Sequence, residues 1–410
     1  MMLMQRYNRF NIKHILFVAT LFLTLSPAQA QNLKIIFAGD LMGHMPQHNA
    51  ARLPDGTYDY APCFRYVKDY VKSADLAIVN LEVPLAGKPY SGYPQFSAPD
   101  ELASAAKEAG FDIMTTANNH CMDRGKNGLE RTLRRLDMLG IPHLGTYLNH
   151  EERDAEHPMI VEMKGMRIAL LCYTYGTNGI EVQRPNVVNF IDTAEMSRDL
   201  RVAKERNADF IITLIHWGIE YAVHSNKEQE QTARWLLEHG CDAVIGGHPH
   251  VVQNFTLDAI PGNNRYPEVV VYSMGNLISN QRDVNTDGGI MVEMTLKKND
   301  GKTNVIDCQY MPYWVFRGSI DGLYQYYIVP SADAVAHPES YQIEGSNLRA
   351  LTTFDKNTRK RLADCVLPDG NNIWERQYNP FTPKPLSNSP LSTVPTLGNS
   401  FLRDVITQQH

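Results

Sequence analysis

Polar side chains with metal-binding chemistry recur along this sequence, each time directly after a short apolar run. They are Asp40, Asn80, Glu82, Asn118, Asn119, His120, His216, His248, His250, Ser273 and Asn276. Carboxylate, amide and imidazole groups without a thiolate are the ligands of Mn, Fe or Zn in hydrolytic sites, rather than of copper or iron–sulfur centres. Because a carboxylate can bridge two ions, we expect one or two divalent cations.

The pair His248 and His250 is the strongest single indication of metal binding. Two imidazoles at positions i and i+2 on a glycine-flanked turn can face one cation from the same side. Taken alone, other residues have ordinary explanations: Asp40 after a glycine is a common turn residue, and His216 could be a hydrogen-bonded core histidine. Their recurrence after successive apolar runs favours one shared site.

The elements that must position these residues follow an alternating pattern. Short β-rich runs cover Leu33–Ala38, Leu76–Val79, Ile113–Thr116, Ile168–Cys172, Phe210–Ile215, Ala243–Ile245 and Val269–Tyr272, and helix-like stretches cover Asp100–Ala109, Asn127–Leu139 and Lys227–Glu238. Strands alternating with helices predict an α/β fold with a largely parallel or mixed sheet. Ligands of such sheets lie just beyond the carboxyl ends of the strands, where the polar residues stand.

The later part of the chain has a different pattern. Gly289–Leu296 and Val305–Tyr310 are expected to be antiparallel strands joined by a turn at Lys297–Thr303. From Ser331 onward the strand pattern decays, and residues 346–366 predict one helix. A Pro-, Asn- and Ser-rich tail follows and is expected to be loop or linker.

The ordered motifs resemble those of the CapA-type capsule-synthesis family (poly-γ-glutamate, PgsA-like), a divergent branch of the calcineurin-like metallophosphoesterases. They are G-D-x-M (Gly39–Met42), N-L-E (Asn80–Glu82), N-N-H (Asn118–His120), H-W-G-x-E (His216–Glu220), G-H-P-H (Gly247–His250) and S-x-G-N (Ser273–Asn276). The resemblance covers about residues 33–280. It implies a metallophosphoesterase-like α/β sandwich of mixed β-sheets flanked by helices, with a C-terminal extension.

The resemblance also implies roles for the site residues. Metal ligands would be Asp40, Glu82, Asn119, His216, His248 and His250, with Glu82 as the bridging carboxylate. His120 stands where the family's general acid stands, so it would protonate the leaving oxygen in a metal-dependent hydrolysis. Residues that would contact the substrate or support the ligands are Asn80, Asn118, Trp217, Glu220, Ser273 and Asn276. Trp217 and Glu220 are equally well explained as a core tryptophan and a surface glutamate.

The sequence departs from the parent pattern in its first motif. The usual D-x-H has Met42 in place of the histidine, and His44 could substitute only if the turn folded back. The second motif carries Glu82 where an aspartate is usual. One metal position is therefore expected to be weaker or empty, and a mononuclear centre is an open alternative.

The N-terminus predicts export to the periplasm or the medium. Residues 1–30 combine basic residues, the apolar run Ile15–Leu25 and the cleavage pattern Ala28-Gln29-Ala30, which is typical of a signal peptide. The apolar run is too short to span a bilayer, and no transmembrane segment is expected after cleavage. We expect a family domain at residues 31–330 and an extension at 331–410. Six widely spaced cysteines are expected to remain mostly unbridged.

Charge limits the partners. The net charge is −6, and the first 30 residues contribute three basic residues and no acid. Such a chain is not expected to bind nucleic acid. The functions that remain are a metal-dependent phosphoester hydrolase, a capsule or envelope polymer protein, and a non-catalytic binding protein with a degraded metal site. An anionic small molecule or polymer would be the substrate, although a polyanion would need a local basic groove. Protein partners stay undetermined.

Overall fold

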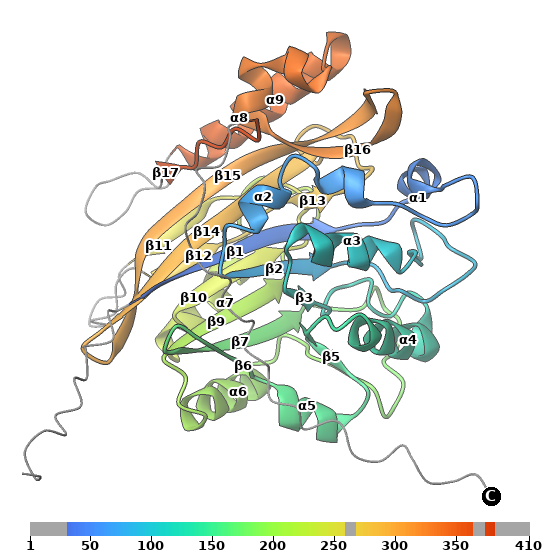
Figure 1. Ribbon diagram of the computed structural model, residues 1–410. Coiled ribbons are helices and arrows are strands. Elements are labelled where there is room, and N and C mark those ends of the chain that lie inside the picture. Colours follow the sequence, from blue (N-terminus) through green and yellow to red (C-terminus); the bar gives the residue numbers. More distant parts are fainter. Residues whose placement is uncertain (1–30, 259–267, 364–373, 382–410) are drawn as a thin grey trace, which may run out of the picture.

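A computed structural model describes residues 31–258, 268–363 and 374–381. Two mixed β-sheets lie face to face, with helices on their outer faces (Figure 1). The expected α/β sandwich of mixed sheets flanked by helices is confirmed. The proposed signal peptide and the tail after residue 381 lie outside the described residues.

The first sheet has the order β16-β15-β14-β1-β2-β3-β4, with β13 paired to β1 and β17 to β15. Its strands are β1 (Asn32–Leu41), β2 (Leu76–Leu81), β3 (Ile113–Thr115), β4 (His143–Leu144), β13 (Asn276–Ile278), β14 (Gly288–Asn299), β15 (Lys302–Ile320), β16 (Leu323–Pro330) and β17 (Trp374–Glu375). The strands β1 to β4 are parallel. β14, β15 and β16 form an antiparallel meander on the other side of β1.

The second sheet has the order β11-β12-β10-β9-β7-β6. Its strands are β6 (Met159–Met163), β7 (Met166–Thr174), β9 (Phe210–His216), β10 (Ala243–Gly247), β11 (Phe255–Asp258) and β12 (Glu268–Val271), and a separate pair joins β5 (Thr146–Tyr147) to β8 (Val187–Val188). The four central strands are parallel. Their carboxyl ends therefore share one edge of the sheet.

Helices cover the outer face of each sheet. They are α1 (Met45–Ala51), α2 (Lys68–Val71), α3 (Glu101–Ala109) and α4 (Gly125–Met138) beside the first sheet or its edge, and α5 (His150–Glu156), α6 (Thr193–Glu205) and α7 (Lys227–Glu238) beside the second. The remaining helices are α8 (Ser331–Ala336), α9 (Gly345–Leu362), and the 3-10 turns η1 (Ala61–Phe64) and η2 (Pro338–Tyr341).

Side-chain alternation along the strands builds the layers. In β1, Ile35 and Phe37 face the core between the sheets, where they join Ile212 of β9. Ile36 of β1 belongs to the core under α3, which contains Leu102. Because successive strand residues point to opposite faces, one buried strand serves both layers.

Local helix signals matched the structure closely. α7 spans the predicted Lys227–Glu238, and Asn226 forms a capping box with Gln229 at its start. α3 ends at Gly110, whose φ of 113° is the left-handed conformation that favours glycine. Asp100 precedes α3 but does not cap it with its side chain; its carboxylate pairs with Arg131 instead, 2.8 Å away.

The strand meander is longer than predicted. β15 runs ten residues beyond the expected end at Tyr310, to Ile320, and β16 was not expected. Both hairpins turn on an Asp-Gly pair with positive φ, at Asp300-Gly301 and Asp321-Gly322. Two-residue turns of this composition are a strong hairpin signal, so the first turn is tighter than the predicted Lys297–Thr303.

Residues after 330 pack onto this meander in the part that the structure describes. Leu351 and Phe354 of α9 join Trp314 and Tyr327 in one hydrophobic cluster. The predicted helix at residues 346–366 corresponds to α9, which begins one residue earlier and ends at Leu362. The extension therefore begins as an integral layer on β15 and β16.

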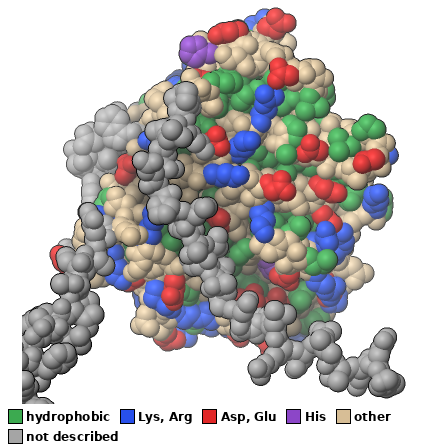
Figure 2. All heavy atoms as spheres, in the orientation of Figure 1, with side chains coloured by type: hydrophobic (Ala, Val, Ile, Leu, Met, Phe, Trp, Pro, Cys, Tyr) green, Lys and Arg blue, Asp and Glu red, His purple; other side chains and the backbone are tan. Residues whose placement is uncertain are grey.

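Three further observations bear on the predictions from sequence. The five described cysteines are all free, and Cys365 lies outside the described residues. Of the helices that the structure describes, none has the length and apolar character needed to cross a membrane. On the face shown in Figure 2, basic and acidic side chains are interspersed over the described surface.

Candidate metal centre

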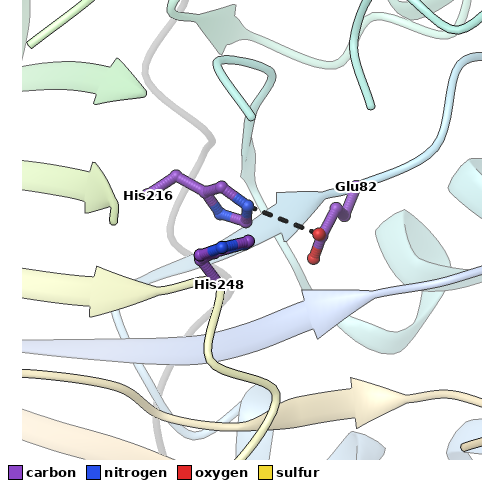
Figure 3. A group of neighbouring side chains, drawn as sticks. All are labelled: Glu82, His216 and His248. Carbon is purple, nitrogen blue, oxygen red and sulfur yellow. Dashed lines mark ion pairs between the residues drawn. The ribbon is translucent and has the colours of Figure 1, made fainter. Parts of the chain in front are cut away.

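Strand ends from both sheets bring the predicted ligands together. Asp40 lies in β1, Glu82 follows β2, and Asn119 lies in the turn after β3. From the second sheet, His216 ends β9, and His248 and His250 follow β10. Figure 3 shows Glu82 pointing toward His216 and His248 from the opposite side. The centre thus lies where the carboxyl ends of the two sheets meet.

Two groups of potential metal ligands share one carboxylate. One group is Glu82, His216 and His248, the other is Asp40, Glu82 and His250, and the ligand atoms within each lie within 4.8 Å of one another. Nε2 of His216 lies 3.3 Å from Glu82 Oε1, and Nε2 of His250 lies 3.8 Å from the same oxygen. Nδ1 of His250 lies 3.2 Å from Asp40 Oδ2. Two adjacent cation positions bridged by Glu82 fit this geometry.

Asn119 adds an amide oxygen to the first of these groups. Its Oδ1 lies 2.8 Å from Nε2 of His216. Its Nδ2 donates to Oδ1 of Asn178, 3.2 Å away, on the loop after β7. Because the nitrogen is engaged by Asn178, the oxygen faces the ligand group.

The donor atoms fit a divalent cation. Both carboxylate oxygens of Glu82 and the Nδ1 atoms of His248 and His250 are buried and have no hydrogen-bond partner among the described residues. Buried polar atoms normally have a partner, so such a concentration indicates a missing ligand. All of these side chains offer oxygen or imidazole nitrogen, the donor set of Mn, Fe or Zn.

Electrostatics lead to the same conclusion. Burial raises the pKa of Glu82 well above its usual range, and the neighbouring charge of Asp40 raises it further. Burial lowers the pKa of His216, and it lowers the pKa of His248 to about 3. Burial alone would raise the pKa of Asp40, but the adjacent His250, whose Nδ1 lies 3.2 Å from Asp40 Oδ2, and the nearby His216 lower it overall. Neutral imidazoles are the form that binds metal, and a cation would favour the ionised form of Glu82.

The backbone of the histidine turn is strained. His248 has a φ of 97° and His250 a φ of 58°, both in the left-handed region that non-glycine residues rarely adopt. Gly247 precedes them, and a Cβ at this position would lie 2.8 Å from Asp40 Oδ1. The turn therefore requires glycine for the close approach of Asp40.

Asn80 and Asn118 support the ligands by hydrogen bonds. Nδ2 of Asn80 donates to Asp40 Oδ1, 2.8 Å away. Asn118 donates to Asn80 Oδ1 and to the carbonyl of Leu81, at 3.2 and 2.8 Å. Its own Oδ1 accepts from the backbone N–H of His120 at 3.2 Å. These contacts connect the carboxyl ends of β1 and β2 to the turn after β3.

Ser273 and Asn276 hold backbone in place. Nδ2 of Asn276 donates to Gln281 Oε1 and to the carbonyl of Thr286, both at 2.8 Å, and lies 3.4 Å from the carbonyl of His250. Oγ of Ser273 accepts from the backbone N–H of Gly275 at 3.3 Å. Their side chains are buried, which differs from the substrate-contacting role open to them in the sequence.

Trp217 lies apart from the ligand groups. It packs in the core between the second sheet and its helices, and its indole N–H donates to the carbonyl of Tyr272 at 2.9 Å. Of its two explanations, the structure therefore favours core packing over a role in substrate access. Glu220 is exposed on the loop after β9, and its charge contributes to the raised pKa of Glu82.

His44 does not replace the missing histidine of the first motif. Its Nδ1 lies 3.1 Å from Gln47 Oε1, and it belongs to neither ligand group. Met42 is fully buried in the hydrophobic core under the helices. The Asp40 group therefore has three protein ligands in the described chain.

Asp123 is a site residue whose role was not recognised from the sequence. Its Oδ2 lies 2.8 Å from Nδ1 of His120 and also accepts from the backbone N–H of Phe96 at 2.8 Å. The only signal in the sequence is a carboxylate three residues after the histidine. The next residue, Arg124, donates from Nη2 to Ser91 Oγ at 2.6 Å.

Two exposed tyrosines flank the ligand groups and were not predicted. The ring of Tyr175 lies 4.5 Å from that of His248, and the ring of Tyr221 lies 6.1 Å from that of His250. They are 46% and 49% exposed. The one signal for them in the sequence is that they follow β7 and β9, at the same edge of the sheet as the ligands.

Comparisons with known proteins place this chain beside capsule synthesis proteins. A model of the family "Bacterial capsule synthesis protein PGA_cap" matches residues 34–281. The capsule biosynthesis protein CapA of Bacillus anthracis is 27% identical over 66% of this chain and 65% of its own length. The PGA biosynthesis protein CapA of Bacillus subtilis is 27% identical over 58% of this chain and 61% of its own length.

The chain thus spans less than two thirds of these curated relatives. A solved structure, the calcineurin-like phosphoesterase YfkN from Bacillus subtilis, matches with a TM-score of 0.42 and 15% identity, over 81% of this chain and 97% of that chain. The family model covers more than half of this chain, including every predicted ligand. The chain therefore belongs to the bacterial capsule synthesis protein family PGA_cap.

Proposed function

We propose that this protein is an exported, metal-dependent hydrolase of the phosphoester type that acts in capsule or cell-envelope polymer biosynthesis. The observation that carries this proposal is the pair of ligand groups joined by Glu82, with the His120–Asp123 pair beside them. Asn178 lies 3.2 Å from Nδ2 of Asn119 and 3.5 Å from Nδ1 of His120, so the proposed acid and a proposed ligand share one neighbour.

The residues divide into two roles. One ion would be held by Asp40, Glu82 and His250, and a second by Glu82, Asn119, His216 and His248. Bound divalent ions polarise an ester oxygen and make a water molecule more acidic. The ion held by Asp40, Glu82 and His250 would have fewer protein ligands, so it would be the one that exchanges more easily.

His120 would act as the general acid. Asp123 accepts a hydrogen bond from Nδ1–H of His120, which leaves Nε2 to carry the proton for the leaving oxygen. No described residue bonds Nε2, and the edge of Phe96 fixes the ring at a centroid distance of 4.7 Å. A histidine held by a carboxylate in this way is useful for proton transfer and unnecessary for binding alone.

The polymer role comes from the family. The relatives named above are described as capsule and PGA biosynthesis proteins, and we extend that process to this chain, with poly-γ-glutamate as the polymer implied by the CapA resemblance. The signal-peptide pattern of residues 1–30 supports export.

A second candidate is a non-catalytic protein that binds an anionic polymer. The observation that favours it is Met42, which occupies the place of a metal-binding histidine and is buried in the core. In that case the side chains of the two ligand groups would have only a structural role, and replacement of His120 would change no hydrolytic activity.

Metal analysis of residues 31–410 tests the main proposal. We expect about one or two equivalents of Mn, Fe or Zn in the purified protein, and loss of the metal in the His248→Ala/His250→Ala double variant. The exposed His337 provides a control, because His337→Ala should keep the metal. Metal-loaded protein would then be assayed with aryl phosphomonoesters and phosphodiesters. No metal after reconstitution would overturn the hydrolase and leave the binding protein.

A further inference from the structure

Two arginines, Arg282 and Arg317, are linked through Tyr326 and Asn280 beyond the carboxyl end of β13. Arg282 is half-buried after β13, and Arg317 is exposed on β15. Nη1 of Arg282 donates to the carbonyl of Val315 at 2.8 Å, and its guanidinium carbon lies 5.4 Å from the ring centre of Tyr326. Nη1 of Arg317 donates to Asn280 Oδ1 at 3.3 Å. Both cations are thus held against the same small group of neutral residues.

Neither arginine is neutralised within the part of the chain that the structure describes. No described carboxylate oxygen lies within the 4.0 Å ion-pair distance of either guanidinium. By contrast, the buried Arg153 lies 2.7 Å from Asp199. Asp287, the acid whose charge acts on Arg282, accepts a hydrogen bond from the indole of Trp314 at 2.6 Å.

The lack of an anion has an electrostatic cost. Burial lowers the pKa of Arg282, and the adjacent charge of Arg317 lowers it further. Two like charges in a partly dehydrated place repel each other, and a bound anion would relieve that repulsion. A planar guanidinium presents parallel N–H donors that match carboxylate and phosphate oxygens.

The pair is connected to the metal centre by short contacts. The backbone N–H of Asn280 donates to Nδ1 of His44 at 3.3 Å, and the ring of His44 lies 5.1 Å from that of Phe96, which lies 4.7 Å from the ring of His120. On the other side, Gln281 accepts from Asn276, which lies 3.4 Å from the carbonyl of His250. The segment that carries Arg282 therefore adjoins the support of the ligand groups.

We propose that Arg282 and Arg317 form an anion subsite that binds a second acidic group of the substrate while another part of the same chain occupies the metal centre. The substrate class is then a linear polyanion with repeated carboxylate or phosphate groups. This inference rests on the proposed function, because it extends the same site. It also provides the local positive charge that a protein of net charge −6 needs to bind a polyanion.

Direct binding tests the subsite separately from hydrolysis. The probes are a fluorescently labelled oligomer of glutamate and a labelled short polyphosphate, measured by anisotropy with the metal-loaded full chain. We expect Arg317→Gln and Arg282→Gln to weaken binding of one probe by about ten-fold or more each, the size of a lost charge-assisted hydrogen bond. Arg234→Gln, an exposed arginine on α7, is the matched control and should bind like the parent.

The identity of the affected probe distinguishes carboxylate from phosphate. Equal binding by the parent and both variants would overturn the subsite, even when metal is present and the hydrolase proposal stands. If the protein holds no metal even after reconstitution but still binds a probe through the two arginines, the subsite is upheld and the hydrolase proposal is overturned. Arg282→Lys, which keeps the charge, should retain more affinity than Arg282→Gln. If Arg282→Gln does not fold, the exposed Arg317 decides the outcome.

Discussion

Nε2 of His216 lies 3.3 Å from a carboxylate oxygen of Glu82, although the two residues come from different sheets (Figure 3). His216 ends β9 of the second sheet, and Glu82 follows β2 of the first. The contact therefore exists only when the sheets are packed with their carboxyl ends aligned. Glu82 makes a similar approach to His250, at 3.8 Å. One carboxylate thus joins both halves of the centre.

Replacement of Glu82 should remove metal and stabilise the metal-free protein. Both of its oxygens are buried without a hydrogen-bond partner among the described residues, so Glu82→Met removes polar atoms whose burial is not compensated by hydrogen bonds. We expect loss of bound metal, measured by mass spectrometry, and an increase of about 1–3 kcal/mol in the free energy of unfolding of the metal-free form. Glu293→Met is the control, because Glu293 pairs with Lys34 at 3.1 Å; it should keep metal and gain no stability.

His120 and Asp123 should affect turnover without affecting metal content. For His120→Ala we expect turnover of an aryl phosphodiester to fall by about 10²–10⁴-fold, the usual contribution of general acid–base catalysis. Asp123→Asn removes the carboxylate that holds Nδ1 at 2.8 Å, so it should cause a smaller loss and alter the pH–rate profile. Unchanged turnover in His120→Ala, with metal present, would remove the acid assignment.

Gly247 should be required for the position of Asp40. A Cβ at this residue would lie 2.8 Å from Asp40 Oδ1, so Gly247→Ala must displace the carboxylate and weaken metal binding. Gly176→Ala is the comparison, because a Cβ there would meet no atom within 4 Å. Titration with Mn²⁺ would compare the two affinities. Equal affinities would show that the turn adjusts without cost.

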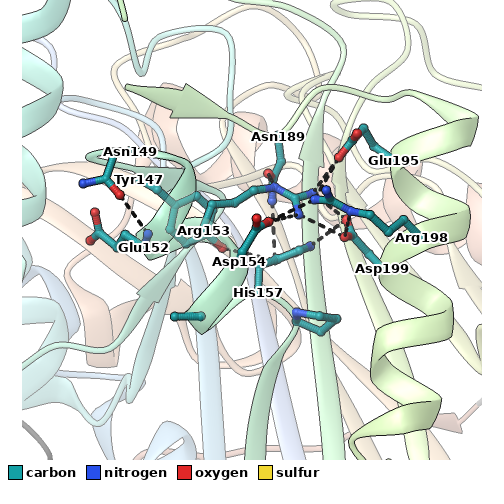
Figure 4. Close-up of polar contacts among 12 residues, drawn as sticks. Tyr147, Asn149, Glu152, Arg153, Asp154, His157, Asn189, Glu195, Arg198 and Asp199 are labelled. Atoms are coloured by element: carbon teal, nitrogen blue, oxygen red, sulfur yellow. Dashed lines mark hydrogen bonds and ion pairs between the residues drawn. The ribbon is translucent and has the colours of Figure 1, made fainter. Parts of the chain in front are cut away.

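Breaking the buried Arg153–Asp199 pair, which joins α5 to α6 beside the second sheet, should destabilise the protein (Figure 4). Two hydrogen bonds of 3.0 and 2.7 Å connect them, and Tyr173 donates to the same carboxylate at 2.8 Å. Asp199→Asn removes the nearest carboxylate of a buried guanidinium and leaves only the longer contacts to Asp154 and Glu195, at 3.6 and 3.4 Å, so we expect a cost of about 3 kcal/mol. The exposed pair of Arg198 with Glu195 is the control, since Arg198→Gln should cost about 1 kcal/mol or less. Urea unfolding measures both.

His48 should make the protein less stable in mild acid. Burial lowers its pKa from 6.5 to about 4, so below pH 6.5 the unfolded chain binds a proton that the folded protein does not. Above about pH 6.5 the neutral His48 does not reduce the free energy of unfolding. As the pH falls from 6.5 toward 4, protonation of His48 in the unfolded chain reduces the free energy of unfolding progressively. Between pH 7 and pH 5 we expect a loss of about 2 kcal/mol from this residue. Urea unfolding of His48→Gln should show a correspondingly smaller difference between these pH values, and an equal difference would contradict the assignment.

Local patterns were sufficient for much of the fold. The strands that precede the ligands were predicted within a few residues, because their β-branched runs end in glycine or polar residues. α7 was predicted with both ends, and its signals are local, because Asn226 directly precedes its first residue and Gly240 follows its last residue closely. The extension of β15 and the strand β16 were missed, although Asp321-Gly322 carried the turn signal.

The roles of residues that neighbour the ligands in the sequence were harder to predict than those of the ligands at the strand ends. Asp123 stands three residues from His120, yet its hydrogen bond to Nδ1 depends on the turn after β3. Trp217 follows His216 directly, but side-chain alternation places it on the opposite face, in the helix-covered core. Tyr175 reaches His248 only through the pairing of β7 with β9.

Residue types and their order were enough to indicate the donor set of the site, because carboxylate, amide and imidazole groups follow successive strands. Distances between those donors depended on packing across the core between the sheets. Hydrophobic burial aligns the two sheets without regard to the polar residues at their ends. That alignment brings Glu82 between His216 and His250, which no local pattern along the chain could specify. The positions of Arg282 and Arg317 depend instead on strand pairing within the first sheet, where β13 pairs with β1 and β15 lies two strands from β1.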